Sequence, residues 1–172
     1  TKALPVVEFL SAGLPVIDVR SPGEYVRGHI PGAANVPLFE DWERAVVGTM
    51  YKGVGRDAAV VEGLRIVGPK LAGIVEQARL IAPDGRVAVH CWRGGERSSS
   101  VAWLLGKAGF EQIVTLTGGY KAFRNFVLRE LGHPGPMNIL GGYTGTGKTG
   151  TLAHLRMLGE QVIDLEAMAH HT

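Results

Sequence analysis

One stretch, HCWRGGERSSS (His90 to Ser100), places a cysteine, two arginines and two adjacent glycines close together. Cysteine reacts as the thiolate, and nearby cations or the N-terminus of a helix lower its pKa. Adjacent glycines allow positive φ angles, so successive backbone N–H groups can converge on an anion. Cys91 is the single cysteine of the chain. The stretch therefore favours a nucleophile in an anion-binding loop over a buried structural cysteine.

The loop prediction assigns a role to each residue that follows Cys91. The backbone amides of residues 92–97 hold the anion, two arginines add positive charge, and Ser98 caps the next helix. The loop residues are Trp92, Arg93, Gly94, Gly95, Glu96 and Arg97.

A second stretch, GYTGTGKT (Gly142 to Thr149), satisfies the phosphate-binding pattern G-x-x-x-x-G-K-[ST]. Loop amides and a helix N-terminus bind phosphates, Lys148 adds a charge, and Thr149 is able to ligate Mg²⁺. The expected phosphate-binding residues are Gly142, Gly145, Gly147, Lys148 and Thr149. The pattern indicates a polyphosphate and does not identify a nucleobase.

Three Val/Ile-rich runs predict the buried strands that position the cysteine loop: residues 15–20, 86–91 and 112–119. A helix beginning near Arg97 or Ser98 and ending at Gly109 lies between the last two, which predicts a βαβ unit and a parallel sheet. A further helix begins near Tyr120. Residues 39–82 form a mostly helical insertion, in which Pro69 must kink a helix or begin a new one.

Domain boundaries follow from composition. Residues 1–131 form an α/β domain, and GHPGP at 132–136 is a linker. Residues 137–172 are the truncated start of a P-loop α/β domain, with strands expected at 137–140 and 161–166. Asp164 or Glu166 would lie near the exit of the second strand, facing solvent or else a metal or substrate.

Composition limits the class of protein. Hydrophobic residues make up 45% and charged residues 20% of the chain, as in ordinary globular proteins, and the apolar runs are too short to span a membrane. A lone cysteine suits a reducing compartment, so we expect a cytoplasmic protein. The net charge of +2 is compatible with RNA but too small to indicate it. The chain begins with Thr, and we expect a fragment of a longer protein.

Residues 4–131 resemble rhodanese domains. The resemblance is carried by IDVRSPGEYVRGHIPGAANVP (Ile17 to Pro37), the cysteine loop and LTGGYKAF (Leu116 to Phe123). It implies a parallel sheet flanked by helices and a cysteine that accepts and passes on a chalcogen atom. It also implies that Asp18 and Arg20 support the loop, and that His29 ties a turn together.

One departure from the rhodanese pattern concerns loop length. Common rhodaneses place four residues between the cysteine and the arginine, whereas five residues separate Cys91 from Arg97. The longer spacing also fits cysteine phosphatases and arsenate reductases. Loop length alone therefore leaves chalcogen transfer and phosphate-ester hydrolysis both open.

A rhodanese domain with CWRGGERS, followed by a P-loop, resembles the bacterial tRNA 2-selenouridine synthases, as does VGTMYKGVG (Val47 to Gly55). The resemblance implies a transferase that geranylates wobble 2-thiouridine of tRNA with geranyl diphosphate and then introduces selenium from selenophosphate. No prosthetic group is implied, and Mg²⁺ would bind through Thr149. Cys91 would handle selenium through a selenosulfide or by attack on selenophosphate, and the P-loop would hold a diphosphate.

Several alternatives stay open at the level of sequence. Trp92 either stacks on the uridine base or packs within the loop. Five basic residues of the insertion contact tRNA phosphates or form a solvated helix face: Lys52, Arg56, Arg65, Lys70 and Arg79. The whole chain could instead be a general sulfurtransferase with a nucleotide-binding module, or a binding module without catalytic activity.

Overall fold

The computed structural model describes residues 1–133, 135 and 137–169. The chain divides into two compact units, Thr1–Gly132 and His133–Thr172. The linker expected at 132–136 falls at this division, although Pro134 and Pro136 lie outside the described residues.

Unit 1 is built on a five-stranded sheet in the order β1-β5-β4-β2-β3. All neighbouring strands are parallel. The three expected strands are present as β2 (Val16–Asp18), β4 (Arg86–His90) and β5 (Gln112–Leu116). Two short edge strands, β1 (Lys2–Leu4) and β3 (Ala34–Asn35), complete the sheet. The prediction of a parallel sheet flanked by helices is confirmed.

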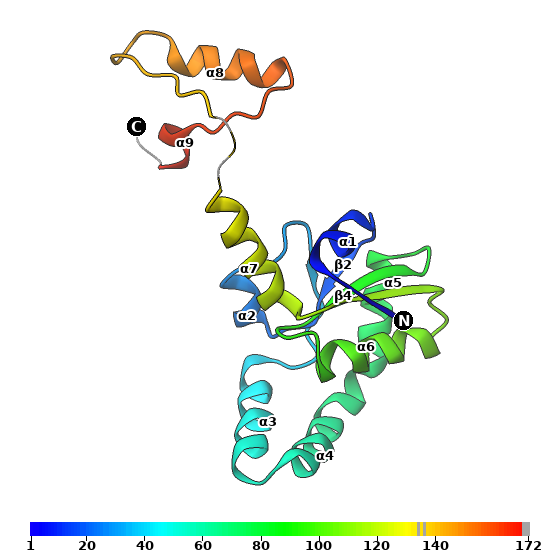
Figure 1. Ribbon diagram of the computed structural model, residues 1–172. Helices are drawn as coiled ribbons and strands as arrows, with labels where there is room; N and C mark the ends of the chain where they lie inside the picture. The colour runs from blue at the N-terminus through cyan, green and yellow to red at the C-terminus, as the bar shows by residue number, and fades with distance from the viewer. Residues whose placement is uncertain (134, 136, 170–172) are drawn as a thin grey trace. The chain divides into compact units, whose positions relative to one another are not determined.

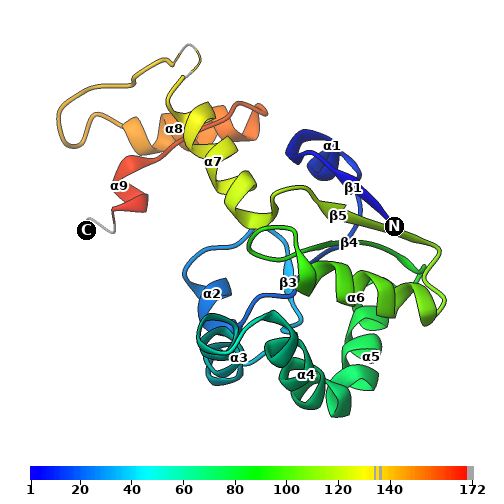
Figure 2. The ribbon, with the colours of Figure 1, turned by 60° about the horizontal axis from the view of Figure 1, so that its bottom comes forward.

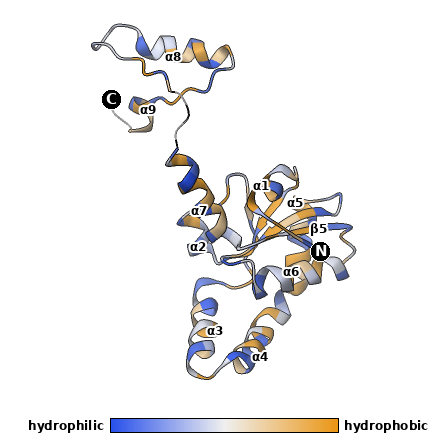
Figure 3. Ribbon diagram, viewed as in Figure 1, coloured by the Kyte–Doolittle hydropathy of each residue, from blue (hydrophilic) through white to orange (hydrophobic). Residues whose placement is uncertain are grey.

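Helices cover both faces of this sheet (Figures 1 and 2). On one face, α1 (Val6–Ser11) and α7 (Gly119–Leu131) pack over an apolar cluster that includes Phe9, Ala88 and Leu116. On the other face, α6 (Glu96–Lys107) and the insertion helices enclose a larger cluster. Val87 and Val89 join the larger cluster while Ala88 joins the smaller one, as strand alternation requires. Apolar residues concentrate along the strands in Figure 3.

The insertion is helical, as its periodicity indicates. It comprises α3 (Asp41–Gly53), α4 (Arg56–Val67), the short 3₁₀ helix η1 (Gly68–Lys70) and α5 (Leu71–Ile81). Pro69 lies in the first turn of η1, where its missing N–H is tolerated. It therefore separates α4 from α5, and the expected break at this proline is confirmed.

The carboxyl ends of three parallel strands meet at one edge of the sheet. Arg20 lies two residues past the end of β2, Cys91 directly follows β4, and the Gly118–Gly119 turn follows β5. The short helix α2 (Pro22–Val26) starts at the same edge. In open parallel sheets this edge is where ligands bind.

Unit 2 contains α8 (Lys148–Met157) and the short helix α9 (Leu165–Met168). The strands expected at 137–140 and 161–166 are absent: 137–140 and 161–164 have no regular structure, and α9 begins at Leu165. A strand persists only where its backbone groups pair with a neighbour, and neither run pairs within the described part of the chain. None of the described residues of this unit is buried.

Candidate active site

The sulfur of Cys91 lies inside a cradle of hydrogen-bond donors. Backbone hydrogen bonds from Arg93, Gly95 and Ser98 favour the thiolate form of the sulfur. The Ser98 hydroxyl oxygen is 3.2 Å from Sγ and 3.1 Å from the Gly95 carbonyl oxygen, and its single proton is directed to the sulfur when Cys91 is a thiolate. The sequence therefore brings together the thiol and the amides that were expected to converge, and the group they surround is the sulfur itself.

The cradle sets the charge state of the thiol. Burial alone would raise the pKa of Cys91, but the hydrogen bonds from the Ser98 hydroxyl and the three amides outweigh it and lower the pKa. Cys91 is 3% exposed. The site thus stabilises a thiolate behind a closed loop, and a substrate must displace part of that loop to reach the sulfur.

Ser98 has a different place from the one expected. The helix begins one to two residues earlier than predicted, at Glu96, and Gly95 occupies the cap position. Ser98 is therefore in the first turn and turns its hydroxyl inward to the sulfur instead of capping the helix. The earlier start brings the positive end of α6 closer to Cys91, which favours the thiolate.

A pair of glycine turns locks the loop against the end of β5. Gly94 and Gly119 have φ values of +66° and +59°, a backbone region that favours glycine. A Cβ on Gly119 would lie 2.4 Å from the Cys91 carbonyl oxygen, and one on Gly94 would lie 2.4 Å from the Leu116 carbonyl oxygen. The Tyr120 amide donates to the Cys91 carbonyl at 2.8 Å. The N-terminus of α7 therefore binds the backbone of the loop, while the first turn of α6 binds the sulfur.

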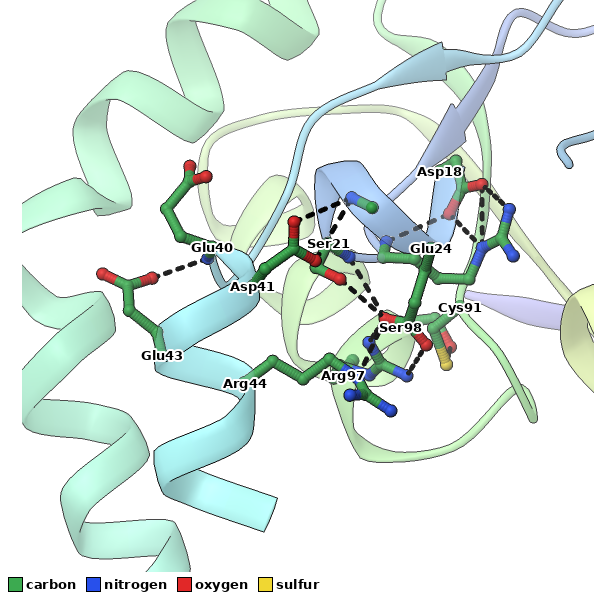
Figure 4. A network of polar contacts seen from close by, with 12 residues as sticks. Asp18, Ser21, Glu24, Glu40, Asp41, Glu43, Arg44, Cys91, Arg97 and Ser98 are labelled. Carbon is green, nitrogen blue, oxygen red and sulfur yellow. Dashed lines mark hydrogen bonds and ion pairs between the residues drawn. The ribbon is translucent and has the colours of Figure 1, made fainter. Parts of the chain in front are cut away.

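The Arg97 side chain of the loop is directed to Glu24 (Figure 4). The Arg97 guanidinium donates to Glu24 at 2.7 Å, so its charge is compensated. Glu96 pairs with Arg56 of α4 at 2.8 Å. Arg93 is exposed. The backbone, and not the arginine side chains, supplies the contacts to Cys91 in this conformation.

Glu24 is the centre of a charge cluster between α2, α3 and α6. It also accepts from the Ser21 amide and hydroxyl, both at 3.2 Å, and pairs with Arg44 at 3.2 Å. Burial alone would raise the pKa of Glu24, but Arg97 first and then the Ser21 amide and Arg44 lower it. Sequence reasoning missed this residue, and its only local signal was the capping pair Ser21 and Glu24 at the start of α2.

Asp18 and Arg20 form a fully buried ion pair beneath the loop. Arg20 also donates to the Gly28 carbonyl at 2.8 Å, and its guanidinium carbon lies 3.9 Å from the centroid of the Tyr120 ring. His90 is equally buried, with Nε2 3.7 Å from the Asp18 carboxylate. Burial lowers the pKa of His90, so the imidazole is neutral at physiological pH.

His29 and Trp92 make contacts within unit 1. His29 stacks on Tyr25 with ring centroids 4.0 Å apart and contacts the Tyr25 carbonyl, which agrees with the expected turn. The half-buried Trp92 has its ring centroid 5.8 Å from that of Tyr120 and 5.9 Å from the Arg20 guanidinium carbon. Trp92 therefore packs in the loop and still leaves part of its indole accessible.

Most basic residues of the insertion are already engaged inside unit 1. Arg56 pairs with Glu96, Arg65 pairs with Glu62, and Lys70 pairs with Glu43. Arg79 donates to the Ala108 carbonyl and lies over the Phe110 ring. These contacts favour the solvated-face interpretation over an RNA-binding surface on the insertion.

The glycine-rich loop of unit 2 leads into α8. Gly145 and Gly147 have φ values of +82° each, and Gly147 caps the helix. Lys148 lies at the start of α8, and its ammonium donates to the Tyr143 carbonyl at 3.0 Å. A hollow of about 380 Å³ is lined by Thr144, Gly145, Gly147, Lys148, Thr149 and Glu166. Gly142 lies at the opposite end of the loop, where a Cβ would approach the Thr146 hydroxyl to 2.9 Å.

Asp164 caps α9 by accepting from the Ala167 amide at 3.0 Å. Within the described residues, no group of three or more His, Cys, Asp or Glu side chains is arranged to hold a metal ion. The same residues include no helix with the length and apolarity needed to cross a membrane.

Comparison with known proteins identifies the family of this fold. Residues 6–126 match the family described as "Rhodanese-like domain". A solved structure, the N-terminal domain of a Clostridium difficile protein named as a candidate ATP/GTP binding protein, superposes with a TM-score of 0.66 at 40% identity. The match covers 74% of this chain and 99% of that domain.

Several curated relatives carry the same name. The tRNA 2-selenouridine synthase of Bdellovibrio bacteriovorus is 43% identical over 92% of this chain and 42% of its own length. The tRNA 2-selenouridine synthase of Bordetella petrii is 42% identical over 95% of this chain and 44% of its own length. The chain therefore spans less than half the length of these relatives, and nearly all of this chain takes part in the match.

Proposed function

The chain belongs to the family of rhodanese-like domains, and we propose that it is the thiol-bearing part of a tRNA 2-selenouridine synthase. The names of the relatives, at about 40% identity, support this reaction. The observation that carries the proposal is the cradle around Cys91, where three amides and the Ser98 hydroxyl lower the pKa of the thiol. A thiolate at the centre of a loop of backbone amides suits a donor that contains both a chalcogen and a phosphate.

The proposed reaction has two stages. In the first, the sulfur of 2-thiouridine in tRNA attacks geranyl diphosphate, a carbon–sulfur bond forms, and diphosphate leaves. In the second, selenium from selenophosphate replaces the geranylated sulfur at C2 of the uracil, and geranyl thiolate leaves. The products are 2-selenouridine, geranyl thiol, diphosphate from the first stage and phosphate from the second.

We assign Cys91 to the second stage. The thiolate attacks phosphorus of selenophosphate, the sulfur–phosphorus bond forms, and selenium leaves with its electron pair as hydrogen selenide ion. That ion displaces geranyl thiolate at C2, and water then releases phosphate from the cysteine. Attack at phosphorus is favoured over a selenosulfide, because attack at selenium would expel phosphite and the selenosulfide would then need a reductant, which the reaction does not supply, to release selenium. The amides of residues 93–98 would stabilise the phosphoryl oxygens after the loop opens.

We assign the glycine-rich loop to the first stage. Lys148, Thr149 and the amides at the start of α8 would bind the diphosphate of geranyl diphosphate, with Mg²⁺ on the Thr149 hydroxyl if a metal takes part. The open hollow bordered by Lys148 and Glu166 supports this assignment. In this assignment each stage has its own phosphate-binding loop.

The test uses the full-length protein, thiolated tRNA, geranyl diphosphate and selenophosphate, with nucleosides identified by mass spectrometry. Cys91→Ser should accumulate 2-geranylthiouridine and lose selenouridine at least about a hundredfold, because removal of a catalytic nucleophile costs orders of magnitude. Selenouridine made by Cys91→Ser at the wild-type rate would refute the role of the thiol.

Three rivals predict other outcomes with the same protein. A general sulfurtransferase would form a persulfide on Cys91 from thiosulfate and show no preference for selenium. A phosphatase would hydrolyse an aryl phosphate. A binding module without activity would carry a Cys91 thiol whose alkylation has the pH dependence of free cysteine.

A further inference from the structure

A second feature of the same edge is a hollow that begins at Trp92, the residue after the thiol. Its volume is about 530 Å³, which is in the range of small-ligand sites. Four arginines and two aromatic rings line most of it: Arg20, Arg27, Arg44, Arg124, Trp92 and Tyr120. A single carboxylate, that of Glu24, shares the lining, so positive charge dominates.

The arginines reach the hollow from separate elements. Arg27 ends α2, Arg44 belongs to α3, and Arg124 belongs to α7. Arg27 and Arg124 are exposed, and neither pairs with a carboxylate in the part of the chain that the structure describes. Arg44 shares Glu24 with Arg97. Cations spread around one opening are suited to several phosphate groups along a strand.

One of the residues that line the hollow carries an unsatisfied donor. Arg20 is fully buried, and its Nε and Nη2 atoms bond Asp18 and the Gly28 carbonyl. Its Nη1 atom is buried without a hydrogen-bond partner among the described residues. A buried guanidinium N–H without an acceptor is unfavourable, so an acceptor that reached Nη1 would stabilise the site.

The aromatic side of the hollow fits a nucleobase. Trp92 is partly accessible, and its ring is held against Tyr120 with an interplanar angle of 40°. Single-stranded RNA is recognised by stacking of splayed bases on aromatic rings, combined with arginine contacts to the backbone. Trp92 is bonded directly to Cys91, so a base stacked there would lie beside the thiol.

We propose that this hollow binds the RNA strand around the wobble nucleotide, with the base on Trp92 and the flanking phosphates on Arg27, Arg44 and Arg124, and an anionic oxygen on Arg20 Nη1. The inference rests on the proposed function, because it names how the RNA substrate reaches Cys91. Free selenophosphate offers the same phosphate chemistry but neither a base nor a strand, and the test separates the two.

The test measures anisotropy of a fluorescent RNA hairpin with 2-thiouridine in its loop, over a range of KCl concentrations. The double variant Arg27→Gln/Arg124→Gln should bind more weakly, and the slope of log affinity against log salt should fall by about 1.4, at about 0.7 for each lost single-strand phosphate contact. The matched control Arg86→Gln/Lys107→Gln removes the same charge from exposed positions outside the hollow and should keep the wild-type slope.

Stacking is tested by a second pair of variants. Trp92→Ala should lose roughly five- to 150-fold in hairpin affinity, which corresponds to about 1–3 kcal/mol for one stacked base, and Trp92→Phe should recover part of the loss. Far-ultraviolet circular dichroism checks that each variant is folded. Unchanged hairpin affinity in both the arginine and the tryptophan variants would overturn the inference.

Parallel titrations with inorganic phosphate separate the two phosphate sources. Loss of phosphate binding in the double arginine variant with unchanged hairpin binding would assign the hollow to the free donor and refute the RNA proposal. Weakened hairpin binding by the double arginine variant would support RNA binding in the hollow. This holds even if the wild-type protein made no selenouridine, in which case only the proposed function fails. If the double arginine variant made selenouridine with a wild-type KM for tRNA, the proposal that the hollow binds RNA would be refuted and the proposed function would stand.

Discussion

At the scale of single residues, Glu24 has the widest influence on the candidate site. Its carboxylate holds Arg97 at 2.7 Å and Arg44 at 3.2 Å, and it fixes the first turn of α2 through Ser21. It therefore connects the cysteine loop to the insertion. It also keeps the charge of Arg97 away from Cys91 until the cluster is broken.

Glu24→Gln should destabilise unit 1 by about 1.5–3 kcal/mol, because it removes a largely buried hydrogen bond between charged groups. The pKa of Glu24 is lowered in the folded state, so its contribution is complete above the ordinary value of 4.5 and is lost as pH falls through the folded pKa. Urea unfolding at several pH values measures both effects. Glu62→Gln removes an exposed pair and should change stability by less than about 0.5 kcal/mol; equal losses in both variants would contradict this role of Glu24.

At the scale of elements, the loop is fixed by the contact between two glycine turns. Gly94 belongs to the loop after β4, and Gly119 begins the helix after β5. Each would place a Cβ within 2.4 Å of a backbone oxygen of the other segment. The conformation of the cradle thus depends on a neighbouring strand as much as on its own residues.

Gly119→Ala should destabilise unit 1 by roughly 2–5 kcal/mol, from the left-handed backbone and the steric overlap with the Cys91 carbonyl. It should also raise the pKa of Cys91, because the displaced loop no longer directs its amides to the sulfur. Thermal unfolding and thiol alkylation at several pH values check both expectations. Gly48→Ala lies in an exposed, open part of α3 and should be neutral or stabilising. A similar loss of stability in both variants would contradict the proposed contact between the two glycine turns.

Sequence periodicity predicted the elements that bury a complete face. The strands β2, β4 and β5 and the helices around them follow from apolar spacing because each contributes to one of two core clusters. It failed for β1 and β3, which have three and two residues and are defined by their neighbours. Periodicity also failed for the strands expected at 137–140 and 161–166, because these apolar runs pair with no strand among the residues that the structure describes.

The candidate site was predictable in part for a related reason. Cys91, Gly94 and Gly95 lie within one short stretch of sequence, so the cradle could be inferred from local chemistry. The partner of Arg97 could not, because Glu24 is 73 positions away in the chain. The inward turn of Ser98 was missed because it depends on a helix that begins at Glu96.

At the scale of the whole molecule, the two expected phosphate-binding loops belong to different units. The cysteine loop lies in Thr1–Gly132 and the glycine-rich loop in His133–Thr172. The curated relatives are more than twice as long as the part of them that this chain matches. We therefore expect the two stages of the proposed reaction to be separable by mutation.

Lys148→Ala in the full-length protein should slow geranylation of thiolated tRNA while leaving selenophosphate binding near the wild-type value, because the ammonium serves the diphosphate of the first stage. Single-turnover geranylation followed by nucleoside mass spectrometry, and calorimetry with selenophosphate, provide the two readouts. Lys121→Ala, an exposed lysine of unit 1, is the control. The opposite pattern would assign the glycine-rich loop to the selenium donor.

The account depends most on the ionisation of the single thiol, which can be measured without substrate. Ultraviolet absorbance of the thiolate as a function of pH, with the Cys91→Ser spectrum subtracted, reports Cys91 alone because the chain has one cysteine. We predict a midpoint below that of free cysteine, and a higher midpoint in Ser98→Ala. A wild-type midpoint at or above that of free cysteine, unmoved by Ser98→Ala, would contradict the proposal that this loop activates a nucleophile.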